Sequence, residues 1–289
     1  MGQSNGNLAI PMSRFTLRPH QKKPVLERDF TRMPDWFGVL VSRSYRVRWG
    51  QQKVPDKHQL ILESILVSPD EKLIYVKNAK AGSTTITRAF YHYANGKPFP
   101  SPKGIHRPVA KLRQGVQYWH ENYQTLMSGN GFLFTTVRHP YRRTVSAFKN
   151  FFVEQRNDQT HLHLSAIRQF GYSEANSLTR NFDVFLDYIE ASFSLDQFHT
   201  DPHWRKQIYN TGLPHLRFDH IARLENLDEE MPRIAELAGI KDPYGAFRVS
   251  EHANRSEPVD FWPDAAQRAR VRTLYEDDFQ AFGYDDVTS

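Results

Sequence analysis

The sequence contains no cysteine. That absence excludes a disulfide framework and any thiolate-bound metal, and it fits a reducing compartment. No run of roughly eighteen apolar residues is present, so the sequence predicts no transmembrane helix. Residues 1–11 are polar and lack the basic start and apolar core of a secretory signal. From these absences we expect a cytoplasmic protein.

Acidic residues are scarce in one part of the chain. Residues 75–155 carry twelve Lys or Arg and only two Asp or Glu, whereas residues 156–289 carry fourteen and twenty-three. The net charge of +6 therefore hides a strongly basic middle region. Such a region favours an anionic ligand. Hydrophobic residues make up 39% of the 289 residues, which is sufficient for a folded core.

The first 50 residues have the character of a basic extension. They carry nine Lys or Arg and three Asp or Glu, and prolines at 11, 19, 24 and 34 interrupt any regular pattern. We expect residues 1–50 to wrap a single domain formed by residues 51–289. A second interpretation is that this arm contacts an acidic membrane surface or a glycan. The sequence indicates no particular oligomeric state.

Short β-rich runs alternate with helical patterns along the rest of the chain. The expected strands are His58–Val67, Lys72–Val76, Phe132–Val137 and His220–Leu224. The expected helices are Ile86–Tyr93, Tyr141–Val153, Asn181–Phe193, Asp228–Ala238 and Ala265–Phe279. This alternation predicts an α/β fold with a P-loop-like central parallel sheet flanked by helices. Ligands bind such sheets at the carboxyl ends of the strands.

Small and hydroxylated residues follow the second expected strand, in Asn78–Thr85. Small residues let the backbone approach a phosphate, and the next helix offers unpaired N–H groups and the positive end of its dipole. Lys80 adds a mobile charge. The segment is not a Walker A loop, because Lys80 precedes Gly82 instead of standing beside the hydroxyl residues. By itself it is equally compatible with anion binding and with an ordinary loop.

A second basic segment, Arg138–Ser146, follows the third expected strand. The planar guanidinium of Arg138 matches phosphate oxygens, and Pro140 suits the first turn of a helix. Ser146 comes about two helical turns later and is placed to offer a hydroxyl to the same anion. The alternatives are a sheet-edge ion pair for Arg138 and simple packing for Ser146.

Together the two segments resemble those of sulfotransferases that use 3′-phosphoadenosine-5′-phosphosulfate (PAPS). The resemblance is greatest to the Golgi carbohydrate sulfotransferases that modify chondroitin and related glycans. Ala79 stands where that family usually has proline. Further segments with the family's character are His203-Trp204, Phe218–Leu227, His252–Ser256 and Tyr275–Tyr284. Since the membrane anchor and cysteines of the Golgi enzymes are missing, the resemblance indicates a soluble relative of bacterial type.

The resemblance implies a donor site without a metal ion and a carbohydrate or glycolipid acceptor. The residues that it assigns to the 5′ side of PAPS are Lys80, Ala81, Gly82, Ser83, Thr84 and Thr85. Arg138 and Ser146 would hold the 3′-phosphate, and Lys80 would offset charge on the leaving oxygen. The stretch Phe152–Asn181 is expected to line the acceptor cleft.

The general base is left open between three kinds of residue. His106 matches a histidine that follows the first basic segment in the carbohydrate enzymes, and His203 is the second choice. A carboxylate such as Glu225, or one near Asp201, is the third. We interpret His161-Leu162-His163 as a solvated loop, because a metal pair would need a third ligand.

Two other functions remain compatible with the basic region. A P-loop kinase-like nucleotide enzyme would need a lysine inside the loop and a carboxylate for Mg²⁺. A non-catalytic polyanion-binding protein would spread its charge over one face and would need no pair of strand–loop–helix sites. We expect no nucleic acid partner.

Overall fold

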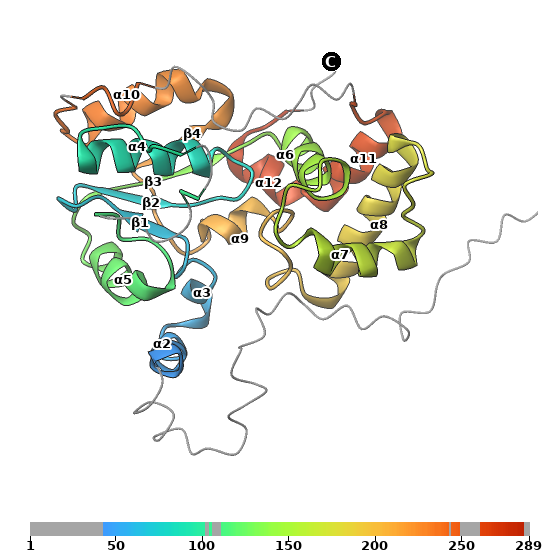
Figure 1. Ribbon diagram of the computed structural model, residues 1–289, viewed down its shortest axis with the longest axis horizontal. Helices are drawn as coiled ribbons and strands as arrows, with labels where there is room; N and C mark the ends of the chain where they lie inside the picture. Colours follow the sequence, from blue (N-terminus) through green and yellow to red (C-terminus); the bar gives the residue numbers. More distant parts are fainter. Residues whose placement is uncertain (1–42, 102–103, 106–110, 243, 249–260, 286–289) are drawn as a thin grey trace, which may run out of the picture.

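Four short strands form one sheet in the order β1-β2-β3-β4 (Figure 1). The strands are β1 (Ile65–Val67), β2 (Leu73–Val76), β3 (Phe132–Val137) and β4 (His220–Arg223). Strands β2, β3 and β4 pair in parallel, while β1 pairs with β2 in antiparallel fashion. The predicted α/β fold is thus confirmed, with a sheet that is parallel except at its first strand. The computed structural model describes residues 43–101, 104–105, 111–242, 244–248 and 261–285.

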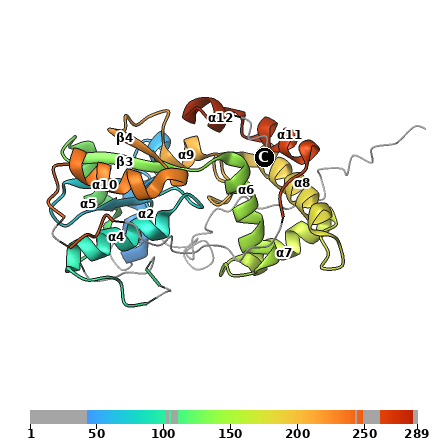
Figure 2. The same cartoon turned by 90° about the horizontal axis from the view of Figure 1, so that it is seen from above.

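Helices cover both faces of this sheet and form a second body beside it (Figures 1 and 2). The helices around the sheet are α2 (Arg43–Gln51), α3 (Asp56–Gln59), α4 (Ser83–Asn95), α5 (Trp119–Met127), α9 (Gln207–Thr211) and α10 (Leu227–Leu237). The helices of the second body are α6 (Pro140–Phe148), α7 (Thr160–Ile167), α8 (Leu178–Asp196), α11 (Ala265–Leu274) and α12 (Glu276–Phe282). Shorter turns are η3 (Val116–Tyr118), the π-helical η4 (Lys149–Val153), η5 (Arg168–Phe170) and η6 (Leu224–Asn226).

The hydrophobic core is divided in the same way. Phe90 of α4 and Met231 of α10 pack with Tyr75 and Phe134 on one face of the sheet. Leu126 of α5 packs with Ile74 and other residues on the opposite face. A separate aromatic cluster fills the second body, and its largest buried members include Phe148, Phe185, Trp204 and Tyr275. The boundary between sheet and second body therefore lies where β3 passes into α6.

Two sequence predictions of secondary structure are wrong. His58–Val67 is not one strand, because His58 belongs to α3 and its ring bonds to Tyr123 Oη at 2.8 Å, which leaves only β1. Ala265–Phe279 is not one helix, because the chain leaves helical geometry at Tyr275. Tyr275 is buried and its hydroxyl donates to Trp204 O at 2.6 Å. In both places a contact distant in sequence overrides the local pattern.

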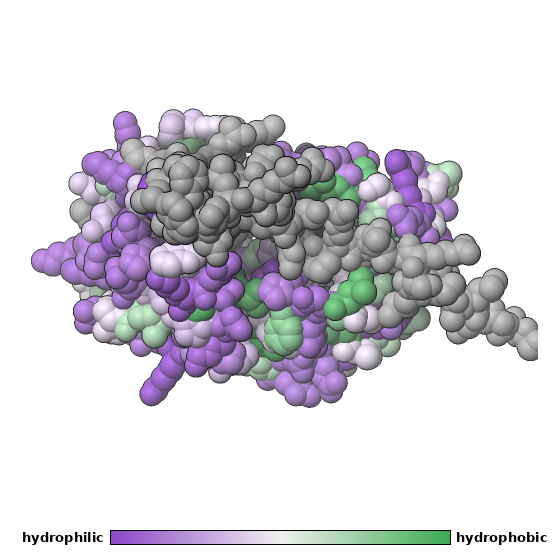
Figure 3. Space-filling view, turned by 90° about the horizontal axis from the view of Figure 1, so that it is seen from below, coloured by the Kyte–Doolittle hydropathy of each residue, from purple (hydrophilic) through white to green (hydrophobic). Residues whose placement is uncertain are grey.

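The amino-terminal part of the described chain packs on the domain. Val47 of α2 contacts a small cluster of Val54, Leu62 and Trp119. The division of the chain at residue 50 stays a prediction, and residues 1–42 and 252–256 lie outside the described residues. Within the described ranges, no helix has the length and apolar character needed to cross a membrane. Seen from below, the described surface is mostly hydrophilic, with hydrophobic residues in small scattered groups (Figure 3).

Candidate active site

The loop between β2 and α4 turns through two residues in the left-handed region. Lys80 has a φ of 64° and Gly82 a φ of 84°. A Cβ atom at Gly82 would also lie 2.7 Å from Leu224 Cδ1, so the position needs glycine. Gly82 is the N-cap of α4, and the first turn of that helix contains no acidic residue. A long helix that starts without a negative charge offers the positive end of its dipole to an anion.

Three successive carbonyl groups of this loop accept hydrogen bonds from side chains at the end of β3, in the link to α6 and in α6 itself. The pairs are Thr136 Oγ1 and Ala81 O at 2.7 Å, Arg138 Nη1 and Lys80 O at 3.3 Å, and Arg143 Nε and Ala79 O at 3.0 Å. The two predicted basic segments are therefore in direct contact. Adjacent parallel strands bring this about, because β2 and β3 end at the same edge of the sheet.

The ammonium group of Lys80 lacks an anionic partner among the described residues. Burial, together with the charges of Arg138 and Arg143, lowers the pKa of Lys80 to about 8. Glu154 acts in the opposite direction. A cation that is desolvated and surrounded by like charges is stabilised when an anion binds beside it.

Arg138 stands at the carboxyl end of β3 and is held there by Gln207. The Gln207 side chain accepts from Arg138 N at 2.9 Å and donates to Arg138 O at 2.8 Å. Burial lowers the pKa of Arg138 to about 10, against the opposing charge of Glu225. The guanidinium stays charged at neutral pH, and its only described hydrogen bond to the protein is the one to Lys80 O.

Ser146, the second residue predicted for this anion site, is buried on α6 with 8% of its surface exposed. Arg142 lies one helical turn before it and is exposed. The charge of Arg142 is close enough to lower the pKa of Arg138. Arg138 thus stands two residues before α6, and Arg142 and Ser146 follow it at successive intervals of four residues.

A buried network of amide side chains fixes α9 beneath both loops. Asn78 donates to Thr136 O and to Gln207 Oε1, each at 2.9 Å. Asp278 accepts from the backbone N–H groups of Gln207 and Ile208 at 2.8 and 3.0 Å. Burial raises the pKa of Asp278 to about 6, although these N–H groups oppose the shift. No pattern in the sequence indicates this network, because its members are far apart along the chain.

Arg143 connects the first loop with the chain that precedes α9. Its guanidinium is buried and donates to Arg205 O at 2.9 Å and to Pro202 O at 2.8 Å, besides the bond to Ala79 O. These contacts bring the segment that carries His203 beside the Lys80 loop. Burial lowers the pKa of Arg143, and its three carbonyl partners satisfy the guanidinium without an acid.

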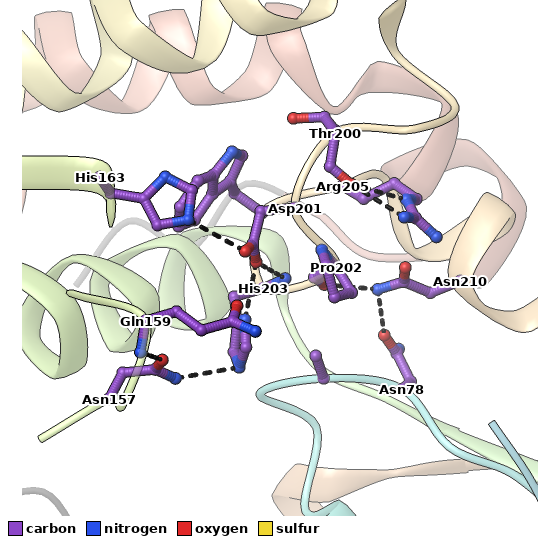
Figure 4. Close-up of polar contacts among 12 residues, drawn as sticks. Asn78, Asn157, Gln159, His163, Thr200, Asp201, Pro202, His203, Arg205 and Asn210 are labelled. Atoms are coloured by element: carbon purple, nitrogen blue, oxygen red, sulfur yellow. Dashed lines mark hydrogen bonds and ion pairs between the residues drawn. The ribbon is translucent and has the colours of Figure 1, made fainter. Parts of the chain in front are cut away.

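Asp201 lies between the rings of His163 and His203 (Figure 4). His203 Nδ1 donates to Asp201 Oδ1 at 2.7 Å, and His163 Nε2 donates to Asp201 Oδ2 at 3.2 Å. Burial acts to raise the pKa of Asp201, but the two histidines outweigh burial and hold it well below its usual range. The hydroxyl of Tyr188 donates to His163 Nδ1 at 2.9 Å.

The hydrogen bond to Asp201 determines which ring nitrogen of His203 carries the proton. Because ionised Asp201 can only accept, the proton of neutral His203 sits on Nδ1, and Nε2 is the basic atom. Asn157 Nδ2 lies 3.4 Å from that Nε2, which is a long contact (Figure 4). A carboxylate that orients an imidazole in this way is the arrangement of a general base.

The structure revises three expectations about neighbouring residues. His163 does not lie in a solvated loop: it sits in α7, is buried and bonds to Asp201, so that prediction is wrong. Both carboxylate oxygens of Glu225 are engaged, with His139 N at 2.8 Å and Tyr284 Oη at 3.0 Å. Phe152 and Tyr172 of the expected acceptor cleft are core residues.

His106 lies outside the described residues. Ile105, just before it, is buried, and its carbonyl accepts from Gln114 Nε2 at 2.7 Å. Gln114 in turn accepts from Lys77 Nζ at 3.1 Å, at the end of β2. Ile105 is therefore anchored near the edge of the sheet at which the basic loops lie.

A sequence profile of the sulfotransferase family matches residues 63–285. The matched range contains both basic loops and the His203 segment. The chain belongs to the sulfotransferase family. Carbohydrate sulfotransferase 11 of Mus musculus is 23% identical over 240 residues, which cover 77% of this chain and 67% of the relative. The Rattus norvegicus protein of the same name has the same identity and coverage. No solved structure gives a significant match.

Several residues of this candidate site are not indicated by any pattern in the sequence. Arg143 and Gln207 act on backbone groups far away in the chain, which local patterns do not reveal. His163 had one signal, because Thr160, His163 and Ile167 recur at helical spacing and share the buried face of α7.

Proposed function

We propose that this sulfotransferase moves a sulfuryl group from PAPS to a hydroxyl group of a carbohydrate or glycolipid. The observation that carries the choice of donor is a pair of partly buried cations, Lys80 and Arg138, on touching loops without acidic partners among the described residues. The name of the relatives, carbohydrate sulfotransferase 11, supports the choice of acceptor.

The charges of the two loops fit a donor with anionic groups at both ends. Lys80 and the start of α4, with Gly82, Ser83, Thr84 and Thr85, suit the 5′-phosphosulfate. Arg138 and Ser146 suit the 3′-phosphate, since a guanidinium and a hydroxyl both donate to phosphate oxygens. Holding the donor at both ends would orient its sulfur toward the acceptor.

The proposed reaction is an in-line displacement at sulfur. The acceptor oxygen forms a bond to sulfur as the bond from sulfur to the phosphate oxygen breaks, and 3′-phosphoadenosine-5′-phosphate (PAP) leaves. Lys80 stabilises the negative charge that builds on the leaving oxygen. His203 Nε2 takes the proton of the acceptor hydroxyl, and Asp201 stabilises the imidazolium that forms.

We propose His203 as the base in place of the first sequence choice, His106. The hydrogen bond from His203 to Asp201 and the link through Arg143 to the Lys80 loop support this assignment. Replacing His203 with Asn should lower kcat by ~10²–10⁴ and leave PAP binding unchanged. If His106→Asn has that effect and His203→Asn does not, His106 is the base.

The donor is tested by sulfuryl transfer. Purified protein with ³⁵S-labelled PAPS and extracted glycan and glycolipid fractions should give labelled product in the presence of EDTA. PAP should raise the melting temperature, whereas ATP with Mg²⁺ should not. If ATP with Mg²⁺ stabilises the protein and PAP does not, the PAPS-dependent function is wrong.

A further inference from the structure

Glu154 follows an irregular stretch of backbone at the end of α6. The helix passes into the π-helical turn η4, and Glu154 N donates to Lys149 O at 2.7 Å. The next residue, Gln155, has a φ of 49°, which is left-handed for a residue that is not glycine. Single π turns and left-handed residues outside glycine are concentrated at functional sites. Glu154 therefore stands between two irregular backbone features.

The carboxylate of Glu154 is buried and only half satisfied. Its side chain is 9% exposed, and Oε1 is fully buried without a hydrogen-bond partner among the described residues. Oε2 lies 3.7 Å from Nε of Arg156, whose side chain is 53% exposed. A buried carboxylate oxygen without a donor costs free energy, so its retention needs an explanation such as a ligand.

Glu154 is linked to residues of both halves of the proposed reaction. Three residues later, Asn157 contacts His203 Nε2 at 3.4 Å. On the other side, the charge of Glu154 is close enough to act on the pKa of Lys80. The proposed reaction needs the acceptor hydroxyl between Lys80 and His203, so the sugar that carries this hydroxyl would lie in the neighbourhood of Glu154.

Building on the proposed function, we propose that Glu154 Oε1 accepts a hydrogen bond from a second hydroxyl of the acceptor sugar, and so selects uncharged sugars over uronates. An ionised carboxylate can only accept, so it takes a hydroxyl and repels a sugar carboxylate. Specificity for a hydroxyl is strong at such a site, because an acceptor without it leaves the buried oxygen unpaired.

The test uses full-length protein, ³⁵S-labelled PAPS and a pool of neutral lactose-type and desulfated uronate-containing oligosaccharides, with labelled products separated by anion exchange. Wild type should label the neutral fraction. Glu154→Gln should lower kcat/KM for that fraction about tenfold or more, mainly through KM, while uronate labelling stays level or rises. Asp158→Asn removes the same charge from an exposed position four residues away and should change neither fraction.

Three outcomes would overturn the role of Glu154. If Glu154→Gln labels both fractions like wild type, Glu154 Oε1 makes no hydrogen bond to the acceptor sugar. If labelling of both fractions falls in proportion, and activity is lost at a lower pH than in wild type, Glu154 acts only as a counter-charge of Lys80. Labelling of neither fraction by wild-type protein that binds PAP rejects the sugar acceptor. Failure of wild type to bind PAP rejects the proposed donor itself, and thermal melting shows whether each variant folds.

Discussion

The candidate site has two parts, which differ in how their charged groups are paired. We call Lys80 and Arg138 the donor side, and Asp201 with its two histidines the histidine side. On the donor side, Lys80 and Arg138 are desolvated cations with lowered pKa values, and neither forms an ion pair with an acidic side chain of the described residues. On the histidine side, Asp201 is paired with both His163 and His203. The first side is therefore incomplete without a polyanion, whereas the second is complete as folded. Substitutions should separate the two sides by their effect on stability.

The largest effect is expected at Lys80. Lys80→Met should lower kcat by ~10²–10³, because the leaving oxygen loses its stabilising charge. The melting temperature should stay level or rise, since a desolvated cation is removed. Steady-state kinetics and thermal melting measure both. The exposed Lys97 is the matched control, and Lys97→Met should change neither. If Lys80→Met lowers the melting temperature as well as kcat, the donor side does not differ from the histidine side in its effect on stability.

The next largest effect is expected at Asp201. Asp201→Asn should lower kcat by ~10–10³, because the amide can stabilise the wrong tautomer of His203. It should also lower the free energy of unfolding by ~1–3 kcal/mol, because buried partners lose a charged acceptor. The depressed pKa means that Asp201 stabilises the fold at neutral pH and that this is lost as pH falls below the ordinary Asp range. Urea unfolding of both proteins at several pH values measures this; equal stability at pH 7 would contradict it.

A smaller effect concerns pH. Burial lowers the pKa of Lys80 to about 8 in the protein without bound donor, so kcat/KM for PAPS should fall as pH rises above about 8. The bound donor favours the charged lysine, so the falling limb in kcat should lie at higher pH. Burial also lowers the pKa of Lys77 to about 8. Lys80→Arg should remove the limb and Lys77→Arg should keep it; the reverse would assign the limb to Lys77.

The smallest effect is expected at Ser146. Ser146→Ala removes one neutral hydroxyl from the predicted 3′-phosphate site and should raise KM for PAPS by about fivefold, with kcat unchanged. Thr144, two residues earlier on α6, donates to Pro140 O at 2.9 Å. Thr144→Val is therefore a control that tests a hydroxyl used by the helix itself, and it should leave KM for PAPS unchanged.

The donor side could be predicted from the sequence because its residues are contiguous. Small, hydroxylated and basic residues directly after a strand indicate an anion site, and both Asn78–Thr85 and Arg138–Ser146 have this composition. Strands β2 and β3 also lie almost where the sequence predicts them. The histidine side joins residues that are far apart in the chain. The partnership of His163 with Asp201 depends on the packing of α7, and a run of histidines in a polar stretch does not indicate it.

Arg143 shows the same limit within a predicted segment. It stands five residues after Arg138, yet its task is to bond three carbonyl groups from two distant loops. Backbone carbonyl groups occur at every position, so no residue pattern marks the ones that a buried arginine will use.

The central claim is that Arg138 and Lys80 form the two ends of one nucleotide site. Calorimetric binding of PAP and of adenosine 5′-monophosphate, which lacks the 3′-phosphate, to wild type and Arg138→Ala tests it most directly. Wild type should prefer PAP by ~10–10². In Arg138→Ala this preference should collapse, while adenosine 5′-monophosphate binds as before. An unchanged preference for PAP in Arg138→Ala would contradict the account.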